Sequence, residues 1–401
     1  MTDRVNRSGL HCAEPGESTV PAPPCNLLLV SASKSWTQAV QDAAAELGGG
    51  VSSCDAKGAV IRLACMAPHY SHLLLHPDSA DGLLNELVNL TAGDRDSSTE
   101  MLLLGTAETS RPRIGIIRSA DRGAVRQALA PHPAHALESD SDPMHLTELR
   151  EALDGAMIET RYQPIVRLAD RQPVALEALA RLNHPTRGTL PPDEFVPQIE
   201  AAGLAARLTD LVANRALADM AGPLLAAHRL DVTLNFPLDV LLVPDALDRL
   251  DAGRRAAGVA VEQVIIELTE SRSVDDLAAL RGVLERLRAD GYRVSIDDVS
   301  PAVPHVAELL ELPFNSLKLD KAVVRYMPQE QALQAFVQRT MDVARARHLS
   351  VVAEGVEDIA IWQRMLALGA DFAQGFLVAR PLPAAAVPIW LEAWRSQPEF
   401  G

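Results

Sequence analysis

The distribution of apolar and polar residues divides the chain into a short lead-in and two larger segments. Residues 1–24 are rich in Pro, Ser and Gly, which predicts a disordered lead-in. From residue 26 onward, short apolar runs alternate with amphipathic stretches, interrupted by a break at 131–143 that is rich in Pro, His, Ser and Asp. This pattern predicts a first α/β domain at 26–130, a linker with a connecting helix at 131–156, and a second domain at 157–395.

The first domain alternates candidate strands with candidate helices. We expect strands at 25–33, 59–64, 70–76, 100–107 and 113–119, and helices at 36–47, 81–90 and 124–130. Strands that alternate with helices predict a doubly wound parallel sheet. The run Gly48-Gly49-Gly50 follows a helix and does not open one, so it indicates a helix C-terminus and not a nucleotide-binding loop.

The second domain repeats one pattern eight times, in which an apolar strand ends in a polar or acidic residue and a helical stretch follows. The strand candidates are YQPIVRL, PVALEALAR, DVTLNFP, QVIIELTES, RVSIDDVS, NSLKLDK, SVVAEGVE and DFAQGFLVARP. Eight such units over about 235 residues predict a (β/α)8 barrel. In these barrels the functional groups lie at the carboxyl ends of the strands.

The polar residues at the strand ends are mostly acidic. They are Glu177, Asn235, Glu267, Asp297, Asp298, Lys318, Glu354 and Gln374. Carboxylate and amide oxygens favour Mg²⁺ or Mn²⁺, and the lack of a histidine at these strand ends argues against zinc. So many carboxylates at one barrel mouth repel each other unless cations lie between them. Two divalent ions in such a site hold a phosphoryl group and activate a water molecule for attack.

Each of these residues taken alone has an ordinary structural explanation. A single strand-end carboxylate is commonly a helix cap or part of a solvated turn. A single lysine such as Lys318 is typical of a surface, and Asn235 and Gln374 fit turns. Because all eight polar residues end apolar strands within one barrel-length domain, we favour a shared metal site over eight separate caps.

Composition narrows the classes of partner. The formal net charge of -16 disfavours binding to nucleic acid or to an anionic membrane surface. The four cysteines all lie within the first 65 residues and show no CxxC spacing, which favours free thiols. No signal-peptide pattern and no apolar run of membrane-spanning length is present, so we expect a cytoplasmic protein.

Nine motifs of the second domain occur in the order known from one bacterial family. They are YQPIV at 162–166, EALAR at 177–181, PPDEFVPQIEAAGL at 191–204, LNFP at 234–237, IELTES at 266–271, IDD at 296–298, LKLD at 317–320, AEGVE at 353–357 and AQGFLVARPLP at 373–383. The domain therefore resembles the EAL domain family, phosphodiesterases that hydrolyse cyclic di-GMP. The motifs cover nearly the whole domain, which makes the resemblance specific.

The resemblance implies a role for each matching residue. It implies an enzyme that opens cyclic di-GMP to linear pGpG with two Mg²⁺ or Mn²⁺ ions, and a homodimer formed through one or both domains. The implied metal ligands are Glu177, Asn235, Glu267 and Asp297, with Asp298 on the second ion. Lys318 and Glu354 would position and activate the attacking water. Arg181 would contact a substrate phosphate, and Gln374 and Glu357 would complete the surroundings of the substrate and the metal ions. Glu270 would brace the loop after Asp297 and Asp298.

The loop after Asp298 departs from the family. The family usually continues with Phe-Gly, Thr or Ala, then Gly-Tyr-Ser-Ser, whereas this chain reads VSPAVPH at 299–305. Ser300 and Ala302 replace the two glycines, and proline fixes φ and removes a hydrogen-bond donor. We therefore expect slow turnover. The second hypothesis is an inactive EAL domain that serves as a cyclic di-GMP receptor or as a protein-interaction module.

The first domain resembles a degenerate response-regulator receiver. The paired acids after the first strand are replaced by Ser31-Ala32-Ser33, and the phospho-acceptor position holds His76. Arg118 stands near the position of the receiver lysine, and the connection between the last two strands is too short for a helix. We expect a pseudo-receiver that binds a partner or dimerises without phosphorylation. The chain contains no GGDEF-like stretch, so nothing supports synthesis of cyclic di-GMP.

Overall fold

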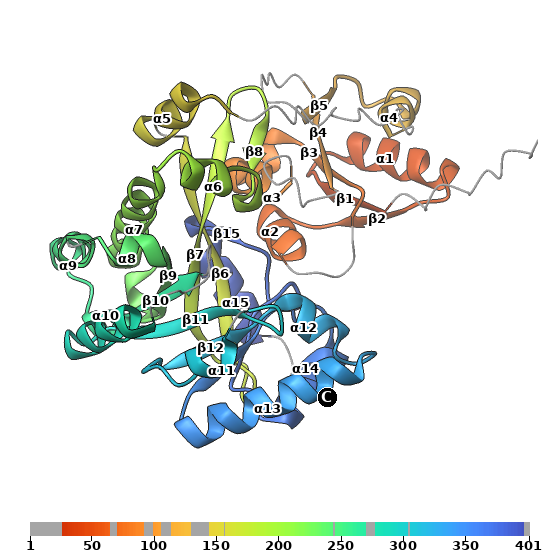
Figure 1. Cartoon of the computed structure of the whole chain (residues 1–401). Coiled ribbons are helices and arrows are strands. Elements are labelled where there is room, and N and C mark those ends of the chain that lie inside the picture. The colour runs from red at the N-terminus through yellow and green to blue at the C-terminus, as the bar shows by residue number, and fades with distance from the viewer. Residues whose placement is uncertain are drawn as a thin grey trace, which may run out of the picture.

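A computed structural model of the chain shows two α/β units, drawn in red to orange and in yellow to blue in Figure 1. The residues that it describes are 26–64, 70–91, 99–105, 114–129, 144–155, 157–243, 245–269, 277–303 and 305–396. Among these residues, no helix combines the length and the apolar character needed to cross a membrane.

The first unit is a five-stranded parallel sheet in the order β2-β1-β3-β4-β5. Its strands are β1 (Asn26–Val30), β2 (Gly50–Ser53), β3 (His72–Leu75), β4 (Glu100–Leu104) and β5 (Ile114–Ile117). Helices α1 (Lys34–Glu46) and α4 (Arg122–Leu129) pack on one face, and α2 (Ala56–Ala64) and α3 (Leu84–Leu90) pack on the other. The predicted doubly wound sheet is confirmed, and its strand order is the one found in flavodoxin and in receivers.

One element of the first unit was predicted wrongly. Residues 59–64, expected as a strand, belong to helix α2, and the second strand is β2 instead. A short apolar run occurs both in strands and in buried helices, so the sequence pattern does not distinguish the two. The packing of α2 identifies this segment as a helix. Ala59, Val60 and Leu63 are buried on one helical face, and the Asp55 carboxylate accepts a hydrogen bond of 2.7 Å from the Gly58 N–H in the first turn.

The predicted turn at the end of α1 is confirmed. Gly48 has a φ of +68°, a conformation that glycine adopts without strain. The Gly49 N–H donates to the Ala44 carbonyl at 2.8 Å, which closes the helix in the manner of a C-terminal cap.

The second unit is a closed barrel of eight strands. Around the barrel the order is β6-β14-β13-β12-β11-β10-β9-β7, and β7 pairs back with β6. The strands are β6 (Ile158–Arg167), β7 (Pro173–His184), β9 (Asp231–Pro237), β10 (Val264–Thr269), β11 (Arg293–Val299), β12 (Ser316–Leu319), β13 (Ser350–Ala353) and β14 (Phe372–Ala373). Two short strands, β8 (Gly188–Leu190) and β15 (Leu382–Pro383), add to β7 and β6.

The barrel differs from a regular (β/α)8 barrel at its first strand. β6 runs antiparallel to both of its barrel neighbours, β7 and β14. The connection from β6 to β7 spans only residues 168–172, and a parallel pair needs a crossover of a dozen residues or more. The other strands of the barrel pair in parallel, so their carboxyl ends meet at one mouth.

Helices surround the barrel and bury the outward face of each strand. They are α5 (Leu146–Asp154), α6 (Pro192–Ala201), α7 (Ala205–Ala221), α8 (Leu238–Leu241), α9 (Ala246–Ala257), α10 (Leu277–Ala289), α11 (Val306–Leu309), α12 (Lys321–Tyr326), α13 (Gln331–Arg347), α14 (Ile359–Leu368) and α15 (Val387–Ser396). Outward residues such as Ile266, Val294 and Leu317 are fully buried in this layer. Because side chains alternate along a strand, the residues between them point into the barrel.

The two units share a packed interface. α2 packs against α15, and α3 packs against β15. Figure 1 shows both orange helices facing the blue C-terminal part of the barrel. The Arg380 N–H donates to the carbonyl of Ala64, the last residue of α2, at 2.9 Å. One hydrophobic cluster contains both Val60 and Trp390, so the cores of the two units are continuous.

Candidate active site

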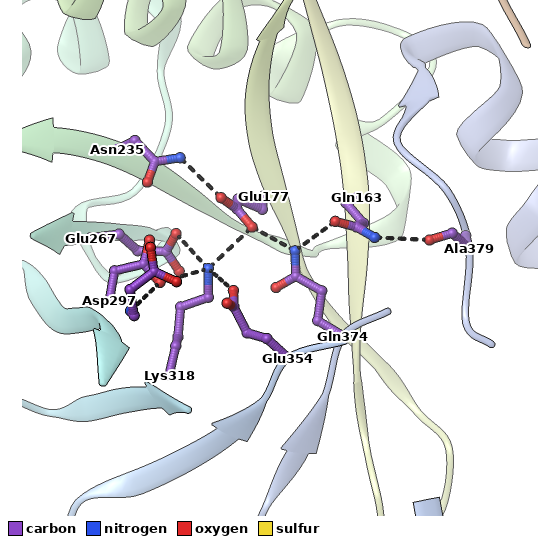
Figure 2. A network of polar contacts seen from close by, with 10 residues as sticks. Gln163, Glu177, Asn235, Glu267, Asp297, Lys318, Glu354, Gln374 and Ala379 are labelled. Atoms are coloured by element: carbon purple, nitrogen blue, oxygen red, sulfur yellow. Dashed lines mark hydrogen bonds and ion pairs between the residues drawn. The ribbon is translucent and has the colours of Figure 1, made fainter. Parts of the chain in front are cut away.

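Seven of the eight residues predicted at strand ends come together inside the barrel, although Glu177 lies within β7 and not at its end. Figure 2 shows Glu177, Asn235, Glu267, Asp297, Lys318, Glu354 and Gln374 converging from the strands around them. Their placement follows from strand register, because paired residues on neighbouring strands share a face. Glu267 on β10 pairs with Asn235 on β9, and Glu177 on β7 pairs with Gln163 on β6.

Lys318 lies at the centre of this cluster. It is 1% exposed, and its Nζ lies 3.1 Å from Glu177, 3.2 Å from Glu267, 3.3 Å from Asp297 and 2.6 Å from Glu354. Burial alone would lower the pKa of the Lys318 ammonium, but the four carboxylates outweigh burial and raise the pKa well above its ordinary value. Lys318 is therefore a buried, permanently charged cation.

Glu177 is the best-bonded carboxylate of the cluster. It accepts hydrogen bonds from Asn235 Nδ2 at 2.9 Å, from Lys318 Nζ at 3.1 Å and from Gln374 Nε2. Burial alone would raise the pKa of Glu177, but Lys318 and these hydrogen bonds lower it below the ordinary value. Glu177 is therefore ionised at neutral pH.

The other carboxyl groups of the site ionise less readily than isolated carboxyl groups, because one ammonium does not balance all of them. Burial and neighbouring carboxylates raise the pKa of Glu354 to about 8 despite the opposing charge of Lys318. At the more open mouth, partial desolvation and the nearby Asp297 and Asp320 raise the pKa of Asp298 to about 6. Burial and neighbouring carboxylates also raise the pKa values of Glu267 and Asp297. Four carboxylates around one ammonium, with Asp298 beside them, favour the binding of a further cation.

The adjacent acids Asp297 and Asp298 end β11 at an irregularity in the strand pairing. The register with β12 shifts between Ile296 and Val299, and Asp298 has a φ of +50°. Asp297 points into the barrel, whereas Asp298 is exposed at the mouth. Oxygens of Asp297, Asp298 and Glu354 all lie within 4.8 Å of one another. This group of hard oxygen donors fits a divalent cation such as Mg²⁺ or Mn²⁺.

A chain of amides positions Gln374, and one of its members, Gln163, was not among the site residues predicted from the sequence. Gln163 Nε2 donates to the Ala379 carbonyl at 3.1 Å, and Gln374 Nε2 donates to Gln163 Oε1 at 3.0 Å (Figure 2). Because a carbonyl only accepts, it fixes the orientation of the Gln163 amide, which in turn fixes that of Gln374. Gln374 thus presents its N–H group to Glu177. The sequence signal for Gln163 was a polar residue inside the apolar YQPIV run.

Gly355 and Gly375 directly follow Glu354 and Gln374, and close backbone packing at both glycines places these two residues in the site. Gly355 has a φ of +63°, and a Cβ at this position would lie 2.8 Å from Cβ of Lys321. A Cβ on Gly375 would lie 2.3 Å from the Val356 nitrogen. Side chains at either position would displace the backbone next to the site.

Comparison with protein families decides the membership of the chain. The model described as the EAL domain matches residues 146–381, more than half of the sequence. The chain belongs to the EAL domain family.

Several proteins named as cyclic di-GMP phosphodiesterases are similar to this EAL domain. NbdA of Pseudomonas aeruginosa is 37% identical over 249 residues, which cover 62% of this chain and 32% of NbdA. RocR of the same organism is 30% identical over 244 residues, which cover 59% of this chain and 61% of RocR. The matched region thus spans less than two thirds of either relative.

Solved structures of EAL proteins share the fold. The PaMucR phosphodiesterase in a c-di-GMP complex is 30% identical with a TM-score of 0.56, and the match covers 60% of this chain and 97% of that one. The EAL enzyme Bd1971, bound to cAMP and cyclic di-GMP, is 25% identical with a TM-score of 0.58, over 61% of this chain and 68% of that one.

Two further site residues predicted for the EAL domain, Arg181 and Glu357, lie outside the Lys318 cluster. Arg181 lies four residues beyond Glu177 on β7, is 4% exposed, and donates from Nη1 to the Ala180 carbonyl at 2.9 Å. Glu357 follows β13 and lies 3.9 Å from Nη1 of Arg325 on α12. Glu270 lies outside the described residues.

The loop after β11 of the EAL domain adopts a turn. The Val303 N–H donates to the Ser300 carbonyl at 3.1 Å. Among the described residues of this loop, the left-handed conformation falls on His305, with a φ of +53°, and not on Ser300 or Ala302. Pro304 lies outside the described residues. The residues that replace the family glycines therefore adopt conformations that any residue tolerates.

The residues predicted to stand at receiver-site positions follow the carboxyl ends of β1 and β3. His76 follows β3, and its Nδ1 lies 3.9 Å from Asp78. The Ala32 N–H, after β1, donates to Ser79 Oγ at 3.1 Å. This edge carries hydroxyls and an imidazole where a receiver carries aspartates, which is consistent with the predicted degenerate receiver.

Proposed function

We propose that the EAL domain of this chain is a Mg²⁺- or Mn²⁺-dependent phosphodiesterase that hydrolyses cyclic di-GMP to linear pGpG. The observation that carries this proposal is the buried cluster of four carboxylates around Lys318, with Asp298 beside it at the mouth. The names of similar proteins support the choice of substrate.

In this proposal two metal ions are held by residues that the fold already brings together. The ligands are Glu177, Asn235, Glu267, Asp297 and Asp298. The bound ions would polarise the phosphoryl group and lower the pKa of a water molecule. Excess negative charge in the cluster supports a requirement for cations, because ionising Glu354 and Asp298 is unfavourable without them.

The remaining residues act on water and substrate. Lys318 and Glu354, 2.6 Å apart, orient the attacking water, and the Glu354 carboxylate accepts its proton. Arg181 contacts a substrate phosphate as a charged donor, and Gln374 and Glu357 complete the substrate surroundings. Glu270 is proposed to brace the loop that follows Asp298.

We also infer that turnover is slow. Asp298 carries a left-handed backbone at the end of a strand, and the loop behind it lacks the family glycines. A ligand displaced by about 1 Å lowers a rate on the order of a hundredfold. The same observation supports the second candidate function, a cyclic di-GMP receptor or interaction module without turnover.

The first unit is proposed to be a pseudo-receiver that is not phosphorylated and that contributes to a homodimer. Support comes from its receiver-like strand order and from His76 in place of an aspartate. We propose no role in nucleic-acid binding, given the net charge of -16.

One assay separates the two candidate functions. Purified protein is incubated with cyclic di-GMP and Mn²⁺, and the nucleotides are separated by chromatography. We expect slow formation of pGpG that Glu177→Ala abolishes, since this variant removes a ligand and leaves the outer core intact. Binding of cyclic di-GMP without any pGpG would favour the receptor. Normal turnover by Glu177→Ala would show that the site is assigned wrongly.

A further inference from the structure

Two buried hydroxyls lie directly beneath the carboxylate cluster, and neither has a role in the proposed reaction. Thr233 on β9 is 1% exposed and Ser295 on β11 is 2% exposed. Thr233 Oγ1 and Ser295 Oγ are both buried and form no hydrogen bond with the described residues. Buried polar groups in folded proteins nearly always have a partner, so these two hydroxyls require an explanation.

Strand register places both hydroxyls inside the barrel. Thr233 pairs with Glu177 across β7 and β9, and Ser295 pairs with Glu267 across β10 and β11. Each hydroxyl also precedes a proposed metal ligand by two positions on its own strand, and such residues share a face. The surrounding site residues are Glu177, Asn235, Glu267 and Asp297. The hydroxyls therefore form a polar floor one layer below the proposed ligands.

Several other positions of this layer are apolar, although Ser316, two positions before Lys318 and paired with Ser295, is also polar. Ile165, Ala175 and Val352 form a small buried cluster inside the barrel. Two of them occupy equivalent positions, because Ala175 precedes Glu177 by two residues and Val352 precedes Glu354 by two residues. Packing alone is thus satisfied by apolar residues at this depth. Hydroxyls occur on the side of the floor that lies under Asn235 and Asp297.

We propose that Thr233 and Ser295 are positioning residues that hold internal water and, through it, orient Glu177 and Glu267 for metal binding. Neither hydroxyl bonds a carboxylate directly, so a bridge requires a water molecule, which typically makes about three hydrogen bonds at a buried site. This inference rests on the proposed function, because it assigns a role toward the metal ions. Residues that orient metal ligands typically change metal affinity by about 10- to 100-fold.

The test compares variants that lose the hydroxyl at position 233 or 295 with two controls. One control keeps a hydroxyl at position 233, and the other loses a buried hydroxyl outside the barrel interior. Thr233→Val and Ser295→Ala remove the hydroxyls with little change in volume, and Thr233→Ser retains one. Thr340→Val, at a 3% exposed position on α13, is the control for loss of a buried hydroxyl outside the barrel interior. Mn²⁺ affinity of the full chain is measured by calorimetry, and the thermal midpoint is measured without metal.

We expect Thr233→Val and Ser295→Ala each to bind Mn²⁺ about tenfold more weakly. Thr233→Ser and Thr340→Val should keep the wild-type affinity. If the two hydroxyls are simply unpaired, their removal leaves Mn²⁺ affinity unchanged and raises the midpoint, because a desolvated donor is lost. That result would overturn the inference while leaving the phosphodiesterase proposal intact.

A crystal structure of the wild-type chain provides a second test that does not depend on the folding of variants. We expect an ordered water within hydrogen-bond distance of Thr233 Oγ1 or Ser295 Oγ, and also of a carboxylate above it. The absence of ordered water next to Thr233 and Ser295 in a high-resolution structure would contradict the inference. A wild type that binds no Mn²⁺ in calorimetry would instead contradict the proposed metal dependence, and the internal water would still decide the role of the floor.

Discussion

At the scale of single residues, the number of donors around each buried carboxylate determines its ionisation. Glu177 accepts hydrogen bonds from three side chains, and its pKa is lowered although it is buried. Glu354 contacts the same lysine at 2.6 Å, but burial dominates and raises its pKa to about 8. Neighbouring acids in one cluster thus favour opposite protonation states, as is common where chemistry takes place.

This difference predicts how the metal-free protein responds to pH. The folded-state pKa of Glu354 lies above its ordinary value of 4.5, so folding takes up a proton between pH 4.5 and about 8. Stability should therefore fall as pH rises through this window, by about 1.4 kcal/mol per unit for one proton. Asp298, with a pKa of about 6, adds a change of the same sign at the lower end of the window.

The measurement is the urea midpoint from pH 5 to 8 in the presence of a chelator. Glu354→Gln should flatten the profile, because a neutral amide replaces the protonated acid. Saturating Mn²⁺ should raise the midpoint most at high pH, where the carboxylates are ionised. A metal-free midpoint that rises with pH would contradict the charge balance inferred for the cluster.

At the scale of elements, the end of β11 leads into the loop whose sequence differs from the family pattern. Val299 is fully buried and pairs with Leu319, while the next residues form a turn. Asp298, within the irregular pairing of β11 and two residues before the turn, carries the left-handed backbone. The position of the proposed second-metal ligand is therefore determined by the loop as well as by the strand.

Replacing this loop with the family sequence should raise turnover and lower the metal requirement. The graft consists of Val299→Phe, Ser300→Gly, Pro301→Thr, Ala302→Gly, Val303→Tyr, Pro304→Ser and His305→Ser. Because Val299 is buried, a phenylalanine there overfills its site, so a second graft keeps Val299. Pro301→Thr alone serves as the control for a change of composition without glycine.

Turnover is measured against Mg²⁺ and Mn²⁺ concentration for each graft. The graft that keeps Val299 should show the larger gain if overpacking at 299 matters. A wild type already as fast as its active relatives, or folded grafts without any change, would argue against a restrictive loop.

At the scale of the whole molecule, the first unit packs on the C-terminal part of the barrel, on α15, β15 and Arg380. Ala64 at the end of α2 accepts a hydrogen bond from Arg380, and the preceding residue, Ala379, accepts one from Gln163. Gln163 in turn orients Gln374. The interface and the cluster are thus joined by a short run of backbone and two amides.

Removal of residues 1–140 should lower both the stability of the barrel and its affinity for Mn²⁺. The deletion uncovers the apolar faces of α15 and β15 and removes the carbonyl partner of Arg380. The urea midpoint and calorimetric Mn²⁺ affinity of the truncated and full chains test this expectation. Lys57→Ala is the control, because its 3.8 Å pair with Glu392 is exposed and contributes little. A truncated barrel that matches the full chain in both measurements would show that the interface is dispensable.

The sequence by itself indicated which polar residues the barrel strands bring toward the site. Polar residues in or after apolar strand runs identified Glu177, Asn235, Glu267, Asp297 and Lys318 before any contact was known, although Glu177 lies within its strand and not at its end. This succeeded because parallel strands place their carboxyl ends at one mouth, whatever the details of packing. The prediction failed at 59–64, where a short apolar run fits a strand and a buried helix equally well.

Only the tertiary structure decided which of these residues touch. Lys318 and Glu177 are 141 positions apart in sequence, and barrel closure brings them to 3.1 Å. Strand register also pairs Gln163 with Glu177 and places Thr233 and Ser295 beneath the carboxylates. Periodicity assigns a residue to a face of its own strand, but neighbours across the barrel depend on register and closure, which no local pattern contains.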